Sequence, residues 1–231
     1  MNFLGSLLEN LDFGSAGSEE TSRAVLDLCG KIVPKRAVFV GDDCFTPTLI
    51  RDRFSCDVTA AYADEIRAEK AAAAGLDAIS VQSFEIPETD GGYDLLWYNG
   101  VVEFDGADRR LAQIKQLTAN SGTAVYRTLC WLIEPSPDTL SYCEKRFGIL
   151  EPLDRVIVLA KEQGFRVEDF YIAPKSDWTV HHYKPLSEAA GRFSGQDDGD
   201  AAAGMSVLTK EEEMFELHCE EYSYVYYILK G

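Results

Sequence analysis

The sequence predicts an α/β protein with a mostly parallel sheet and helices on both faces. Two observations predict this class. The strand-length apolar runs at 78–82 and 93–97 are continuous rather than alternating, which is typical of strands buried on both faces. Such runs also alternate with helical segments along the chain, as in the strand–helix–strand units of parallel sheets. At 231 residues the chain is long enough for a sizeable core, and we expect a single domain over 1–231.

In the first half of the chain, the spacing of apolar residues, the N-cap residues and the glycines that end helices predict the secondary structure. Apolar residues at helical spacing within 1–12 indicate a short amphipathic helix. Ser18, followed by acidic residues, fits the N-cap of a second helix that ends near Gly30. An alanine-rich helix stops at Gly75. The elements expected in this half are helices at 1–12, 18–30, 46–53 and 63–75, and strands at 36–41, 57–62, 78–82 and 93–97.

The second half continues the alternation and ends on an aromatic strand. Asn120, Ser121 and Gly122 predict a turn before a strand. Residues 187–205 are small and acidic, which predicts a mobile acidic loop, and 173–208 as a whole is expected to form a lid-like insertion. The elements expected in this half are helices at 108–117 and 209–221, two helices within 137–163 that separate near 148–152, and strands at 123–127, 165–172 and 222–229.

Composition excludes some classes of partner. The net charge of −17 disfavours nucleic acids and anionic membrane surfaces, because their phosphates repel an acidic chain, and a small-molecule substrate fits better. Six cysteines lie far apart without a C-x-x-C pair, and the chain does not start like a signal peptide. These features indicate reduced thiols and a cytoplasmic location. The sequence leaves open whether the protein is a monomer or a homo-oligomer.

The histidines and the cysteine nearest the expected ligand turn do not predict a metal site or a nucleophile. His181 and His182 are adjacent, so in an extended segment they point to opposite sides and do not share one metal ion. His218 stands alone on a polar helix. Cys44 follows two aspartates, which raise the pKa of a thiol and disfavour the thiolate. We therefore expect no metal.

The strand at 36–41 ends in a turn that indicates a ligand site. In α/β proteins, ligands bind beyond the carboxyl ends of parallel strands, and the first strand-to-helix turn uses glycines so that the backbone can approach the ligand. Gly41 starts such a turn here. Asp43 and Phe45 stand where a G-x-G-x-G turn has its second and third glycines. The turn is therefore either an altered ligand site or one that has lost its ligand.

Five local strings carry a resemblance to a known family. Residues 14–21 resemble a G-P-G-S-x-x-x-T entry to the first helix, and residues 94–100 resemble a D-L-I-W-S-E-G strand end. Residues 131–137 resemble W-x-x-x-x-x-P, residues 177–185 resemble W-T-E-H-Y-x-x-P, and residues 220–228 resemble Y-Y-G-Y-V-F-Y-I. Over about 12–230 the chain resembles the class I S-adenosylmethionine-dependent methyltransferases, within them a bacterial small-molecule branch of the ubiquinone/menaquinone-biosynthesis-like type.

This resemblance implies a Rossmann-like methyltransferase fold, with a seven-stranded sheet whose last strand is antiparallel. It also implies S-adenosylmethionine as the cofactor. The positions that it implies around the cofactor are Gly17, Gly41, Asp43, Tyr62, Ser83, Phe84 and Tyr98. Those that it implies near the methyl acceptor, and that we predict to be catalytic, are Asn99, Trp131 and Tyr183, with Trp178 and His182 beside them.

Several positions depart from the family pattern. Phe39 stands where the family has an acidic residue, and Asn99 stands where it has glutamate. Tyr62 occupies the place of the ribose-binding acid, with Asp64 as the nearest carboxylate. Two hypotheses follow. The chain is an S-adenosylmethionine-dependent methyltransferase that acts on a small molecule, or it is a methyltransferase-fold protein that has lost the cofactor and serves as a binding or regulatory module.

Overall fold

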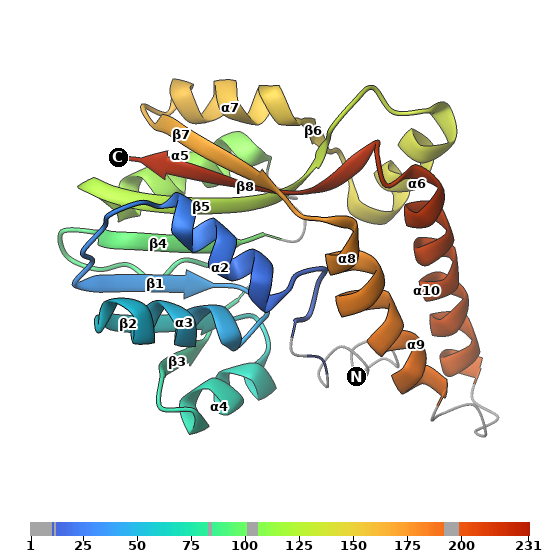
Figure 1. Cartoon of the computed structure of the whole chain (residues 1–231), viewed down its shortest axis with the longest axis horizontal. Helices are drawn as coiled ribbons and strands as arrows, with labels where there is room; N and C mark the ends of the chain where they lie inside the picture. The colour runs from blue at the N-terminus through green and yellow to red at the C-terminus, as the bar shows by residue number, and fades with distance from the viewer. Residues whose placement is uncertain (1–10, 12, 83–84, 101–105, 192–198) are drawn as a thin grey trace.

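A computed structural model describes the chain except for residues 1–10, 12, 83–84, 101–105 and 192–198. Within the described part, one eight-stranded sheet has the order β3-β2-β1-β4-β5-β8-β7, with β6 paired separately to β5 (Figure 1). The strands are β1 Arg36–Val40, β2 Asp57–Tyr62, β3 Asp77–Ser80, β4 Tyr93–Asn99, β5 Thr118–Trp131, β6 Glu151–Pro152, β7 Arg166–Ile172 and β8 Tyr222–Lys230.

The direction of the strands matches the prediction. All pairs among β1 to β6 are parallel, and β8 is antiparallel to both of its neighbours, β5 and β7. The predicted seven-stranded sheet with an antiparallel last strand is confirmed, and the two-residue strand β6 is an addition to it. Because β1 and β4 are adjacent and parallel, their carboxyl ends meet at one edge of the sheet.

Helices cover both faces of the sheet. They are α2 Glu19–Leu28, α3 Phe45–Phe54, α4 Glu65–Ala73, α5 Ala107–Leu117, α6 Pro137–Phe147, α7 Leu153–Glu162, α8 Lys175–Trp178, the π-helix η1 Thr179–Tyr183, α9 Lys184–Gly191 and α10 Gly199–His218. Helices α5 and α7 bury their apolar side chains on one face. Helices α2, α3, α4 and α6 bury theirs on the other. The predicted two-faced covering is confirmed.

Helix caps explain several of the boundaries. The Ser18 side chain accepts a hydrogen bond from the backbone N–H of Thr21, so it is the N-cap of α2, as predicted. Asp64 caps α4 in the same way, through the backbone N–H of Ile66 (2.8 Å). The carboxylate of Asp64, the nearest one to Tyr62 in the sequence, therefore stabilises the start of α4.

Residues 119–122 differ from the predicted turn. They belong to β5, which is longer than the predicted strand at 123–127. Tyr93 pairs with Thr118 and Leu95 with Thr123, so the residues between them bulge out of the ladder. The turn-forming residues of the sequence therefore form an irregularity inside a strand rather than a turn before it.

The predicted loop at 187–205 is wrong for its described parts, which are helical in α9 and at the start of α10. Helix α10 begins at Gly199, and the alanines at 201–203 favour it because alanine has the highest helix propensity. His181 and His182 lie in the π-helix η1 rather than in an extended segment, although His181 is exposed and His182 is buried. The predicted helix at 1–12 lies almost wholly outside the described residues. Among the described helices, none has the length and hydropathy needed to cross a membrane.

Candidate functional site

The turn after β1 lies at the carboxyl edge of the sheet, beside the end of β4. The backbone N–H of Gly41 donates to the carbonyl oxygen of Ala61 in β2 (3.1 Å). A β-carbon at position 41 would lie 2.5 Å from Cζ of Phe39 and 3.0 Å from Cβ of Asn99. Glycine is required here because the Phe39 ring and Asn99 take up the space of a side chain.

Asp43 is fully buried and is held by two hydrogen bonds. The backbone N–H of Thr46 donates to its Oδ1 (2.6 Å), and the side-chain amide of Asn99 donates to its Oδ2 (3.2 Å). The first of these bonds satisfies a backbone N–H in the first turn of α3, whose N-cap residue is Cys44. Burial raises the pKa of Asp43 to about 7, against the lowering effects of the Thr46 hydrogen bond and the Arg127 charge. The carboxylate thus supports the turn itself and titrates near neutral pH.

Asn99 joins the turn to strand β4. Its Oδ1 accepts a hydrogen bond from the indole Nε1 of Trp97 (2.7 Å), and its Nδ2 donates to Asp43. Because an indole N–H can only donate, this contact fixes the orientation of the amide. The structure thus brings together three of the residues predicted from the sequence, Gly41, Asp43 and Asn99.

Arg127 of β5 is a buried residue of this edge that the sequence analysis missed. Its Nη1 donates to Oγ of Ser15 (2.9 Å) and its Nη2 to the carbonyl oxygen of Ala16 (2.7 Å). The same guanidinium lies 4.0 Å from the Asp42 carboxylate and 3.6 Å from the centroid of the Tyr224 ring. An arginine inside an apolar strand run was the available signal, since arginine is rarely buried unless it is paired.

Two further polar side chains are buried near Arg127. The Nδ1 atom of His182 has no hydrogen-bond partner among the described residues, whereas the Asp177 carboxylate has the Ser18 and Thr21 side chains beside it. Burial raises the pKa of Asp177, while the nearby Ser18 and Thr21 side chains lower it. Burial lowers the pKa of His182 to about 4, so its imidazole is neutral at pH 7. This part of the edge therefore contains polar atoms that a ligand could satisfy.

We expect His182 to make the protein sensitive to acid. Its pKa is lower in the folded state than the ordinary value of 6.5, so its contribution to stability is complete above pH 6.5 and is lost as the pH falls towards 4. Between pH 7.5 and pH 4.5 the free energy of unfolding should fall by about 2–3 kcal/mol more in the wild type than in His182→Gln. Urea unfolding at both pH values measures the difference. The raised pKa of Asp43 increases the free energy of unfolding as the pH falls, equally in both proteins, so it cancels in the comparison. If the free energy of unfolding falls equally in both proteins, the expectation is contradicted.

The other predicted cofactor residues lie apart from these hydrogen bonds. Tyr62 is fully buried at the end of β2, with its hydroxyl beside the Cys44 thiol. Tyr98 belongs to the hydrophobic cluster on the opposite face, the one that α5 and α7 cover. Gly17 lies against the Phe13 ring, 3.1 Å from the position that its β-carbon would take. Ser83 and Phe84 lie outside the described residues.

Trp131 and Tyr183 lie in an aromatic cluster rather than against Asn99. The members of this aromatic cluster are Trp131, Trp178, Tyr183, Phe215, Tyr222 and Tyr224. Trp178 is stacked between Phe215 and Tyr224, with ring centroids 4.5 and 5.0 Å away. The Tyr183 hydroxyl donates to the backbone carbonyl of Glu211 (3.5 Å). Tyr224, which contacts Arg127, connects the aromatic cluster to the turn.

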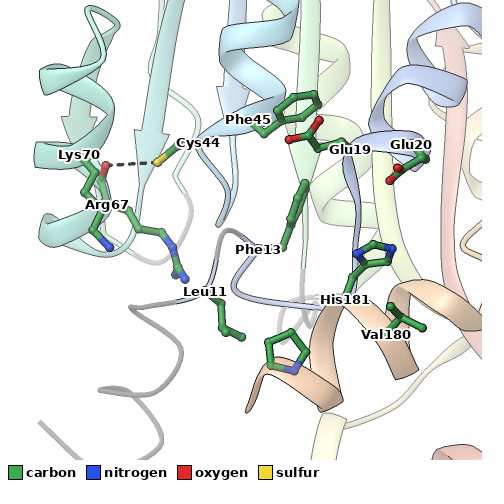
Figure 2. A pocket seen from close by; sticks show the side chains of 11 residues that line it. Leu11, Phe13, Glu19, Glu20, Cys44, Phe45, Arg67, Lys70, Val180 and His181 are labelled. Atoms are coloured by element: carbon green, nitrogen blue, oxygen red, sulfur yellow. Dashed lines mark hydrogen bonds between the residues drawn. The ribbon is translucent and has the colours of Figure 1, made fainter. Parts of the chain in front are cut away.

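A cavity of about 660 Å³ lies on the α2, α3 and α4 side of the same edge (Figure 2). Its charged and aromatic lining residues are Phe13, Glu19, Glu20, Phe45, Arg67, Lys70 and, from the π-helix η1, His181. Cys44 also lines it, but burial raises the pKa of the thiol, as the Asp43 charge does to a smaller extent. The thiol donates to the backbone carbonyl of Arg67 (3.8 Å), so the structure does not present a reactive thiolate there. Over the described residues, no three His, Cys, Asp or Glu side chains are grouped as metal ligands.

No protein-family model and no curated protein matches the sequence. Solved structures match over nearly the whole chain. A S-adenosylmethionine-dependent methyltransferase from Geobacter sulfurreducens, in complex with S-adenosyl-L-homocysteine, has a TM-score of 0.80 at 13% identity and covers 100% of this chain and 98% of its own. A S-adenosylmethionine-dependent methyltransferase from Thiobacillus denitrificans, with the same ligand, has a TM-score of 0.80 at 13% identity and covers 100% and 99%. The cyclase SpnF has a TM-score of 0.68 at 12% identity and covers 96% and 84%. The chain therefore has the fold of the S-adenosylmethionine-dependent methyltransferases.

Proposed function

We propose that the protein is a S-adenosylmethionine-dependent methyltransferase that acts on a small molecule in the cytoplasm. The observation that carries the proposal is the polar group Asp42, Asp43 and Asn99, which stands at the joined carboxyl ends of β1 and β4. In this fold class, ligands bind at that edge. The strongly acidic charge of the chain further supports a small molecule over a nucleic acid.

The residues at the turn fit one end of the cofactor better than the other. Bound S-adenosylmethionine supplies a methyl group carried on a positively charged sulfonium. Gly41 and Asp42 would hold its methionine end, where a carboxylate favours a positive charge. Tyr62 fits the ribose hydroxyls poorly, because its own hydroxyl is buried. Asp64 already caps α4.

We place the acceptor site between Asn99 and the aromatic cluster, which Tyr224 connects to the turn through Arg127. Methyl transfer is an in-line displacement, so the protein contributes mainly by positioning the nucleophile. Asn99 has a fixed amide at the carboxyl edge. Trp131 and Tyr183 are held rigidly in the aromatic cluster, and we assign them the task of shaping the acceptor site.

A second candidate function is a methyltransferase-fold protein that binds a different ligand and does not transfer methyl groups. The observation that favours it is the commitment of both Asp43 oxygens to the protein, together with the buried hydroxyl of Tyr62. The cyclase among the similar structures agrees with the general rule that a fold does not determine the reaction.

Calorimetric titration with S-adenosylmethionine and with S-adenosylhomocysteine tests the two candidates. A methyltransferase should bind both with dissociation constants below about 100 μM. In Asp42→Asn the affinity for S-adenosylmethionine should fall about threefold to tenfold more than the affinity for S-adenosylhomocysteine, because only the former carries a sulfonium charge. Asp52→Asn, on the exposed side of α3, is the matched control and should leave both affinities unchanged. Failure of both ligands to bind at about millimolar concentration would favour the second candidate.

A further inference from the structure

The 660 Å³ cavity has walls of opposite charge. Arg67 and Lys70 project from α4 on one side, and Glu19 and Glu20 project from the first turn of α2 on the other, with Phe13 between them (Figure 2). The volume lies in the range of about 300–1,000 Å³ that is typical of small-molecule sites. A ligand that carries both charges would be complementary to this arrangement.

The basic wall is held in place. The Arg67 side chain is only 9% exposed, and its Nη1 lies 3.5 Å from Oδ2 of Asp64. The same guanidinium atom would lie 2.7 Å from a β-carbon at Gly14, so it packs directly against the backbone there. Lys70 follows one helical turn later on the same face. A fixed guanidinium binds carboxylate and phosphate groups at a low entropic cost.

Two phenyl rings favour a cation in the same space. The rings of Phe13 and Phe45 lie 6.4 Å apart, and both line the cavity. The guanidinium of Arg23 already lies over the Phe45 ring, 5.1 Å from its centroid, and pairs with Glu19 (3.8 Å), so the protein itself partly compensates this side. Aromatic faces attract cations, and the Glu20 carboxylate adds to the attraction of the Phe13 ring for a ligand.

This cavity adjoins the proposed cofactor turn, because Cys44 and Phe45 of the turn line it. Phe13 pairs with Asp43 through an antiparallel β-bridge, and the backbone N–H of Gly14 donates to the carbonyl oxygen of Asp42 (3.0 Å). The N-terminal segment therefore lies along the turn and presents Phe13 to the cavity. Asp43 and Asn99 do not line it.

We propose that this cavity binds a small zwitterion, with its anionic group beside Arg67 and Lys70 and its ammonium group beside Glu19, Glu20 and the Phe13 ring. The site requires no methyl transfer, so it stands whether or not the protein is a methyltransferase. A ligand here contacts Phe13, which pairs with Asp43, and Cys44, which follows Asp43 in the turn, so its binding is coupled to the backbone that holds Asp43.

Titration followed by saturation-transfer NMR tests the proposal with two matched probes, β-alanine and 2-aminoethylphosphonate. They differ only in the anionic group, so their relative affinity distinguishes a carboxylate ligand from a phosphonate or phosphate ligand. Propionate and ethylamine each carry one of the two charges and should bind at least about tenfold more weakly than the zwitterions. Lys70→Glu and Glu20→Lys should each weaken zwitterion binding about tenfold or more. Lys161→Glu, which likewise changes the basic residue in the last turn of a helix, should bind like the wild type.

Protection of Cys44 gives a second measurement that needs no variant. A bound zwitterion should slow its alkylation by iodoacetamide, measured by peptide mass spectrometry, whereas the half-buried Cys219 should react at an unchanged rate. The proposal is overturned if neither probe binds saturably below about 10 mM, or if binding is the same in Lys70→Glu as in Lys161→Glu. Equal binding of the singly charged compounds would also overturn it.

Discussion

Replacing Arg127 by methionine is expected to lower the free energy of unfolding by about 3–5 kcal/mol. Methionine keeps most of the aliphatic volume but removes the charge and all five N–H donors. The variant leaves the buried Asp42 carboxylate without its cation and removes the hydrogen bonds to Ser15 and Ala16. Urea unfolding followed by far-ultraviolet circular dichroism measures the change.

The pH dependence of this loss identifies its cause. The Arg127 charge lowers the pKa of Asp43, which is about 7 in the wild type, so the loss of this charge disfavours the Asp43 carboxylate above pH 7 and matters little at pH 5, where Asp43 is protonated. The penalty of Arg127→Met should therefore be smaller at pH 5 than at pH 8. An equal penalty at both pH values would indicate lost packing against Tyr224 rather than lost charge compensation.

Arg166→Met is a matched control for the same chemical change. The Arg166 side chain is 76% exposed on β7, and its ion pair with Glu168 lies at the surface. Exposed ion pairs contribute little, so this variant should stay within about 0.5 kcal/mol of the wild type. A similar loss in both variants would contradict the account given for Arg127.

The elements at the centre of the sheet were predictable because their patterns are local. Strands β1 and β4 are apolar runs, and Gly41 marks the turn between a strand and a helix. The resemblance pointed to Asn99, and the rule that carboxyl ends of parallel strands share an edge places it beside Gly41 and Asp43. The bulge at 119–122 was not predictable, because the same residue types form turns between strands and irregularities within them.

Arg127 and Asp177 were missed for a different reason. The main partners of Arg127, Ser15 and Ala16, precede it by more than a hundred positions, and only the folded chain brings them together. Asp177 is buried beside Ser18, the N-cap of α2, from an equally distant segment. A single sequence reports that a charge stands in an apolar run but not which residues compensate it. The partners of such a buried charge can therefore be identified only from the tertiary structure.

Trp178→Ala is expected to cost about 3–5 kcal/mol in the free energy of unfolding. The Trp178 side chain is 2% exposed and stacks between Phe215 of α10 and Tyr224 of β8. Its Nε1 donates to Oγ of Ser223 (3.1 Å). The substitution removes the ring that attaches helices α8 to α10 to the sheet. Trp178→Phe retains an aromatic ring without the indole N–H and should lose less.

The lid-like role of 173–208 stays a prediction, and Trp178→Ala tests it. The variant shows whether stability is lost only in this segment, as in a lid, or in the segment and the sheet together, as in a fixed wall. If the segment moves as a lid, Trp178→Ala should open it locally, so limited proteolysis within α9 and α10 should accelerate while the urea midpoint of the sheet stays unchanged. If the segment is a wall, both measurements should shift together, because Trp178 then belongs to the same cooperative unit as β8. The stacking on Tyr224, whose ring also contacts Arg127, favours the wall. A wall would hold Tyr183 at a constant distance from the turn, so the acceptor site would be preformed before any ligand arrives.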